Sequence, residues 1–137
     1  MSKKANSKQT QRKKTVALTD EQIKAITEMM DQFIETLRPI PEIRHLNDVG
    51  WRLKGHSVYV FELKVPLMGM DIRERCEFAR AVWITNKNHW QIFYRPYHHV
   101  SMQYEDKWEP YMPLKTAGNL QRFLIEIKKD PCGCFRG

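Results

Sequence analysis

The sequence contains no long apolar run. The longest stretch without Lys, Arg, Asp or Glu is nine residues, 96–104, and it includes two histidines. A membrane-spanning helix needs about 20 mostly apolar residues, so no membrane span is expected. Residues 1–14 also lack the apolar middle region that a secretory signal requires. These absences predict a soluble protein located in the cytoplasm.

Cysteine is scarce, with three residues in the chain: Cys76, Cys132 and Cys134. An odd and sparse set does not make a disulfide framework, so reduced thiols are expected. The two closely spaced C-terminal thiols and the His98-His99 pair do carry atoms that zinc prefers. Structural zinc sites, however, use wider cysteine gaps and four ligands in paired clusters. We therefore predict no metal and no cofactor, and interpret Cys134 as a small apolar side chain beside Phe135.

The motifs that mark common enzyme classes are missing as well. The sequence has no phosphate-binding loop, no nucleophile elbow and no dinucleotide fingerprint. His98 and His99, together with Glu105 and Asp106, have the residue types of a metal-independent ribonuclease, in which an imidazole accepts the 2′-hydroxyl proton. This small ribonuclease stays a minor hypothesis, and no catalytic residue is assigned.

Acidic residues are absent from the first 14 positions. Six cations stand there: Lys3, Lys4, Lys8, Arg12, Lys13 and Lys14. The remaining 123 residues carry 17 basic and 16 acidic groups, so most of the formal charge of +7 belongs to this segment. We predict a disordered basic arm over residues 1–14, because so polar a segment buries too little apolar surface to offset its ordering entropy.

A basic arm has two interpretations. Six cations on a flexible chain release counterions when they meet phosphates, which favours contact with RNA or an RNA-protein assembly. Alternatively, the arm is a solubilising tail without a partner. An anionic membrane would attract the same charges, but the sequence shows no acyl site or apolar anchor to add to them.

What is present from residue 15 on indicates one globular domain. The chain has 137 residues, 42% of them hydrophobic, and 15 aromatic side chains. That length is common for one domain, and the composition argues against disorder and low-complexity repeats. We expect a single domain over residues 15–137 with a substantial core.

Helical signals stand at both ends of this domain. Thr19-Asp20-Glu21-Gln22 is typical of a capping box, and Pro39 stops the helix that it opens. Near the C-terminus, Asn119 caps a second helix that ends at Asp130-Pro131. Both helices carry an apolar stripe at three- and four-residue steps. The stripe residues are Ile23, Ile26, Met30, Phe33, Ile34 and Leu37 in the first helix, and Leu120, Phe123, Leu124 and Ile127 in the second.

Between the helices the apolar period changes to two. Residues 49–54 and 56–65 alternate around the turn at Lys54-Gly55 and predict a hairpin. A third strand over residues 76–85 and a fourth over 90–95 follow, with a turn at 86–89 between them. Trp90 and Tyr94 are expected on the buried face. Residues 96–118 are predicted to be irregular.

This order of elements predicts an α+β fold. An antiparallel meander of about four strands would have the N-terminal and the C-terminal helix packed on it, most simply on one face.

Two segments carry a resemblance to a known family. Lys107-Trp108-Glu109-Pro110-Tyr111 has the form Lys-Trp-x-x-Tyr, and residues 130–137 read Asp-Pro-x-Gly-Cys-Phe-x-Gly. With the strand positions, they resemble a family of small bacterial proteins catalogued only as a domain of unknown function, over about residues 50–137. The resemblance implies this architecture and a bacterial or phage origin, and no activity. The arm and the long link over residues 96–106 depart from the family pattern.

The segment 96–111 combines aromatic rings with cations. A candidate binding surface contains Arg95, Tyr97, His98, His99, Tyr104 and Lys107. Trp108 and Tyr111 belong to the family motif and are interpreted as core residues. We predict a non-catalytic binding module whose arm contacts RNA. The alternative is a protein-protein adaptor that uses segment 96–111, and deletion of residues 1–14 separates the two.

Overall fold

The computed structural model describes residues 17–65, 74–98 and 100–136. The arm predicted over residues 1–14 and His99 of the candidate surface lie outside the described residues. The order of elements is helix, strands, helix, and the predicted α+β fold with a meander sheet is confirmed.

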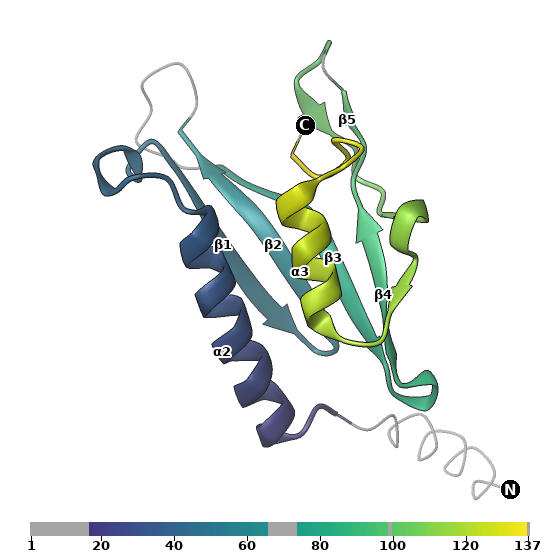
Figure 1. Cartoon of the computed structure of the whole chain (residues 1–137). Coiled ribbons are helices and arrows are strands. Elements are labelled where there is room, and N and C mark those ends of the chain that lie inside the picture. The colour runs from purple at the N-terminus through teal and green to yellow at the C-terminus, as the bar shows by residue number, and fades with distance from the viewer. Residues whose placement is uncertain (1–16, 66–73, 99, 137) are drawn as a thin grey trace, which may run out of the picture.

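Helix α2 (Asp20–Leu37) begins at the predicted capping box. The backbone N–H of Gln22 donates to Thr19 Oγ1 at 3.1 Å, and the backbone N–H of Thr19 donates to Gln22 Oε1 at 2.8 Å. The helix ends before Pro39 and is followed by the short helix η1 (Pro41–Ile43). Ile23 was predicted on the apolar stripe but is 38% exposed, since the first turn of α2 reaches past the β1–β2 hairpin (Figure 1).

The four predicted strands are β1 (Asn47–Lys54), β2 (Ser57–Lys64), β3 (Glu74–Ile84) and β4 (His89–Tyr94). They pair antiparallel in the order of the chain. Gly55 turns β1 into β2 with a φ of 58°, a conformation in which glycine is not strained. Between β3 and β4 stand η2 (Thr85–Lys87) and Asn88, whose φ is 56°.

The segment predicted to be irregular holds several short elements. β5 (Tyr97–His98) pairs with β6 (Gln103–Tyr104), while β7 (Glu109–Pro110) and β8 (Thr116–Ala117) both add to β4. The helix η3 (Met112–Leu114) connects them. Two-residue strands are too short for any apolar period, so their pairing depends on a neighbouring strand that is already in place.

Helix α3 (Leu120–Lys129) starts where Asn119 caps it, with the backbone N–H of Arg122 donating to Asn119 Oδ1 at 3.0 Å. It ends at Asp130, which has a φ of 42°. The Asp130 carboxylate then accepts from the backbone N–H groups of Phe135 at 3.0 Å and Arg136 at 2.9 Å. This contact explains why an aspartate opens the C-terminal motif: it folds the last residues back.

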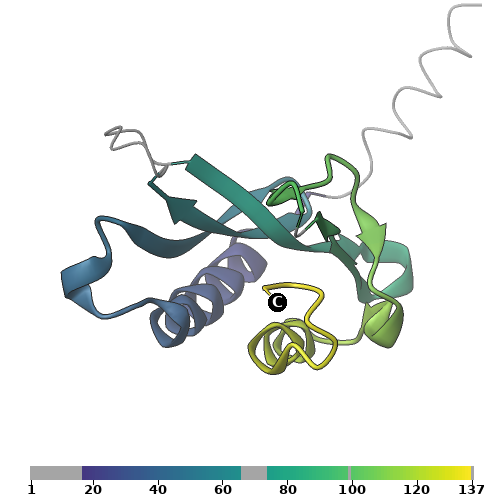
Figure 2. The ribbon, with the colours of Figure 1, turned by 90° about the horizontal axis from the view of Figure 1, so that it is seen from above.

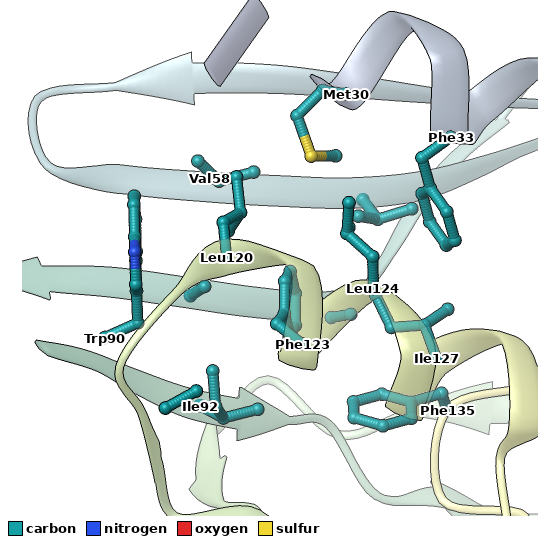
Figure 3. Close-up of a cluster of buried hydrophobic side chains, with 14 of the residues drawn as sticks. Met30, Phe33, Val58, Trp90, Ile92, Leu120, Phe123, Leu124, Ile127 and Phe135 are labelled. Atoms are coloured by element: carbon teal, nitrogen blue, oxygen red, sulfur yellow. The ribbon is translucent and has the colours of Figure 1, made fainter. Parts of the chain in front are cut away.

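Both helices cover the same face of the sheet, as Figure 2 shows. Core side chains come from alternate strand positions: Val58 pairs with Ala81, which in turn pairs with Ile92. All three are fully buried. β3 contributes two small, fully buried side chains, Ala79 and Ala81, and α3 contributes the fully buried Phe123, which Figure 3 shows within the hydrophobic cluster.

The two aromatic residues of the Lys-Trp-x-x-Tyr motif lie on different sides of the sheet. Tyr111 is fully buried in the core, as predicted. Trp108 was also predicted in the core, but it is half-buried and contacts Tyr59 in a tilted arrangement, with ring centroids 5.9 Å apart. Tyr59 belongs to the helix-free face, because its strand neighbours Val58 and Val60 point to the core. Spacing within the motif does not specify which face each ring covers.

A charged pair fastens α2 to β1. Arg38 donates from Nε to Asp48 Oδ1 at 2.9 Å and from Nη2 to Oδ2 at 2.8 Å, and Asp48 is buried. The hydrogen bonds from Arg38 hold the pKa of Asp48 below its usual 3.8. The unfolded chain therefore takes up this proton at a higher pH than the folded protein.

Asp48→Asn is expected to lower the free energy of unfolding by about 1.5–3 kcal/mol at pH 7, because it removes a charge from a bidentate pair. The difference from the native protein is complete above about pH 5 and disappears as the pH falls through the lowered pKa of Asp48. Urea unfolding at several pH values measures it. Glu35→Gln, which touches the same Arg38 but is 61% exposed, is the control and should change stability by less than about 0.5 kcal/mol.

Candidate nucleic-acid interface

The helix-free face of the sheet carries a row of alternating arginines and aromatic rings. Arg52 of β1 is paired with Tyr59 of β2, Tyr59 with Arg80 of β3, and Arg80 with Phe93 of β4. Strand neighbours on one face interact directly, so these four side chains form one continuous line, which we call the cross-strand row.

The guanidinium groups of the cross-strand row lie over the rings. The Arg52 Cζ is 4.0 Å from the centroid of the Tyr59 ring. The Arg80 Cζ is 5.4 Å from the Tyr59 centroid and 5.6 Å from the Phe93 centroid. These distances suit cation–π contacts, which keep the arginines extended along the sheet while leaving every member of the row half-exposed.

The charges of the row are only partly neutralised. Arg52 makes an ion pair with Glu77, and its Nη2 donates to Glu77 Oε1 at 3.2 Å. Arg80 donates to the hydroxyl of Ser57 at 3.3 and 3.4 Å and takes part in no ion pair among the described residues. The row therefore presents positive charge beside half-buried aromatic rings.

A glycine lets the next ring lie flat on the sheet. A Cβ on Gly50 would stand 2.7 Å from Cε1 and Cζ of Phe61, which no real Cβ contact allows. Gly50 is the strand partner of Phe61, and Arg75 covers the ring with its Cζ 4.7 Å from the centroid. A further arginine–aromatic contact, with the ring of Phe61 buried beneath Arg75, thus lies beyond the cross-strand row.

The candidate surface predicted from the sequence is only partly brought together. Arg95 donates from Nε to the carbonyl of Glu105 at 2.7 Å and from Nη1 to the carbonyl of Glu77 at 3.0 Å. Its Cζ lies 5.6 Å from the centroids of both Tyr104 and Trp108. Arg95 therefore fastens the segment after β4 to β3 and connects the Trp108 ring to the Tyr104 ring.

The other predicted members lie on the β5–β6 hairpin or after it. The ring centroids of Tyr97 and Tyr104 are 4.8 Å apart. His98 Nε2 stands 2.8 Å from Glu105 Oε1 at an exposed position, and Lys107 is exposed. His99 and the six arm cations lie outside the described residues.

The sequence alone did not reveal the cross-strand row. Arg52 and Phe93 are visible as outward positions of alternating strands, but Arg80 stands in β3, where a register shift between Val60 and Phe61 of the partner strand disturbs the period. The sequence signal for the cross-strand row is an aromatic residue or an arginine at an outward-facing position in each strand. It becomes a site only when the register is known.

A second feature joins the two motifs of the family resemblance. The ring centroid of Tyr111 lies 4.6 Å from the ring centroid of Phe135. The Tyr111 hydroxyl donates to Glu126 Oε2 at 2.7 Å and lies 3.6 Å from the Cys132 sulfur. Burial and the hydrogen bond to Glu126 raise the pKa of Tyr111, so its hydroxyl stays a donor. The Lys-Trp-x-x-Tyr motif therefore holds the C-terminal segment on the core.

A cleft of about 400 Å³ opens between this C-terminal segment and the β5–β6 hairpin. Its lining includes both C-terminal thiols, three tyrosines and the buried acid Glu62. Burial, and then the hydrogen bond with Cys132, raises the pKa of Cys134 to about 11. A thiol with so high a pKa is a poor nucleophile at neutral pH, and Cys134 packs against the core as predicted.

Over residues 17–65, 74–98 and 100–136, no three His, Cys, Asp or Glu side chains come together as metal ligands would. In the same part of the chain, no helix has the length and apolar character needed to cross a membrane.

The sequence profile of a family described as Domain of unknown function (DUF3024) matches residues 18–137. The chain belongs to this family. The match includes α2, whereas the two motifs indicated the family only from about residue 50 on, since an apolar helical stripe is common to many proteins. No curated protein and no solved structure matches the chain.

Tyr111→Phe is expected to lower the free energy of unfolding by about 1–2 kcal/mol, because it removes the buried hydroxyl that donates to Glu126. Urea unfolding of both proteins measures the difference. Glu126→Gln keeps an acceptor for the hydroxyl and should cost less. Equal stability of Tyr111→Phe and the native protein would contradict the role assigned to this hydrogen bond.

Proposed function

We propose that this member of the DUF3024 family is a non-catalytic RNA-binding module of the bacterial or phage-infected cytoplasm. The cross-strand row is the observation that supports it most strongly. Single-stranded bases stack on aromatic rings and on guanidinium planes, and the row offers both in alternation on a half-exposed face. Stacking of this kind contributes about 1–3 kcal/mol per base.

The basic arm would add affinity without sequence preference. Its six cations have no acid among them, whereas the rest of the chain is nearly neutral. Each phosphate that a cation neutralises releases counterions, so binding should weaken steeply with salt, with a slope of about 0.7 per contact for a single strand. The arm and the sheet face thus have separable contributions: the arm sets the salt dependence, and the row holds bases.

The segment 96–111 suggests two alternative functions. An adaptor that docks a protein partner there is favoured by its exposed apolar side chains, Val100 at 101% and Met102 at 69%. A small ribonuclease would use the exposed His98–Glu105 pair. If the module is non-catalytic, neither the native protein nor His98→Ala cleaves RNA. If the native protein cleaves RNA and His98→Ala does not, the ribonuclease is established.

Arg80→Ala in the full chain is expected to weaken binding of a fluorescent single-stranded RNA about 5- to 20-fold, measured by anisotropy, because it removes a stacking plane and a positive charge without an ion-pair partner among the described residues. Arg122→Ala, which removes the same charge from an exposed position on α3, is the matched control and should stay within about twofold. Equal effects of the two substitutions would contradict a role for the row.

A chain that starts at residue 15 is expected to lose most of its affinity at physiological salt, and its salt slope should fall by up to about 4, since six contacts are removed. The same anisotropy titration at several salt concentrations measures this change. Retention of a single protein partner by both chains after nuclease treatment would instead establish the adaptor.

A further inference from the structure

The cleft between the C-terminal segment and the β5–β6 hairpin contains an acid where the strand pattern calls for an apolar residue. Glu62 is paired with Val49 of β1 and Cys76 of β3, and it shares the helix-covered side of the sheet with Val49. It is only 7% exposed. A buried carboxylate costs free energy unless it is well paired, and departures from the local pattern concentrate at functional sites.

The partners of Glu62 stand at long distances. Lys64 Nζ lies 3.4 Å from Glu62 Oε1, the Tyr104 hydroxyl donates to the same oxygen at 3.4 Å, and Arg136 Nη2 donates to Oε2 at 3.3 Å. Charge-assisted hydrogen bonds are normally about 2.7–2.9 Å. The carboxylate therefore has acceptor capacity left, and it lines a cleft of about 400 Å³.

Aromatic rings form the wall of the same cleft. Tyr94, Tyr97 and Tyr104 all line it, and the Tyr97 and Tyr104 rings are in contact. Two cations, Lys64 and Arg136, stand beside the one carboxylate, so a cationic ligand is disfavoured. The cleft suits a flat, neutral ring with two adjacent donors for the acid and an acceptor for the cations.

Guanine is the nucleobase with that pattern. Its Watson–Crick edge presents N1–H and N2–H side by side, next to the acceptor O6. Adenine offers a donor beside an acceptor on that edge, and uracil offers one donor between two acceptors. A carboxylate whose two oxygens each accept one of these adjacent donors therefore distinguishes guanine from adenine and uracil by hydrogen bonding.

A chain of side-chain contacts connects Glu62, on the helix-covered side of the sheet, with the cross-strand row on the helix-free side. Tyr59 of the row contacts Trp108, Arg95 lies over both Trp108 and Tyr104, and Tyr104 reaches the cleft. Figure 1 shows β5 and the C-terminal segment at the same end of the sheet, and residues of both line the cleft. An RNA strand stacked on the sheet face has a line of planar groups leading to the cleft.

We propose that the cleft binds a guanine base, with the Glu62 carboxylate accepting from N1–H and N2–H, Arg136 or Lys64 donating to O6, and the tyrosine rings stacking on the base. This inference rests on the proposed RNA binding, because the base is taken to belong to a strand bound by the sheet face.

Three labelled oligouridines test this proposal by anisotropy with the full chain: one with a single central guanosine, one with inosine there, which lacks the N2 amine, and one with uridine throughout. The guanosine strand is expected to bind about 10-fold more tightly than the other two. Glu62→Gln should remove this preference and leave the affinity for plain oligouridine unchanged. Glu28→Gln, at an exposed position on α2, is the control and should keep the preference.

Calorimetric titration of the native protein with guanosine monophosphate provides a test that does not depend on the folding of a variant. Binding of guanosine monophosphate, with no heat of binding from adenosine or uridine monophosphate, supports the guanine cleft. If no oligonucleotide binds in addition, the proposal of RNA binding is overturned, but the guanine cleft is not. Equal affinity for all three oligouridines, or absence of any guanosine monophosphate binding, overturns the guanine cleft and leaves RNA binding by the sheet face standing.

Discussion

The pairing register of β2 with its two neighbours is the constraint on which the rest of the molecule depends. It places Val58 opposite Ala81 on the core side and Tyr59 between Arg52 and Arg80 on the other. Because side chains alternate strictly, a slip by one residue would bury the arginines and expose the core. The backbone hydrogen bonds of β2 therefore specify both the hydrophobic core on one face of the sheet and the cross-strand row on the other.

The C-terminal segment depends on this layer for its position. Phe135 is almost fully buried against Tyr111, and Asp130 holds the turn before it through two backbone N–H groups. These contacts bring Arg136 to Glu62, 74 residues earlier in the chain. The two motifs of the family thus act as one structural unit, which also forms a wall of the cleft. Core packing explains Tyr111 and Phe135, and the backbone contacts of the turn explain Asp130, without reference to a ligand.

Two features of the protein are not explained by packing of the core, and these are the candidates for a function. The core accounts for the apolar positions and for Tyr111, but it gives no reason for arginines stacked on half-exposed rings or for a buried acid in an apolar register position. Both features cost side-chain entropy or desolvation in the free protein. The proposals of RNA binding and of a guanine cleft assign one purpose to each of them.

Local signals in the sequence were sufficient for the helices, the four long strands and their meander order. The capping box at Thr19, the cap at Asn119 and the period-two alternation act over a few residues, so no distant partner is needed to recognise them. The short strands β7 and β8 were not predicted, because they are defined only by their pairing with β4 and have no sequence pattern of their own. Trp108 was placed on the wrong side of the sheet for a related reason: a ring in a long connection packs wherever the chain crosses the sheet.

Charge segregation into the first 14 residues, the fold class and the apolar stripes were determined by the sequence itself, because each is a property of neighbouring residues. Only the tertiary structure decided that Arg52, Tyr59, Arg80 and Phe93 form one row, and that Glu62 meets Arg136 beside three tyrosines. These contacts join residues from separate strands and from the chain end. Their distances are set by sheet register and by the packing of the C-terminal segment, which a linear pattern does not encode.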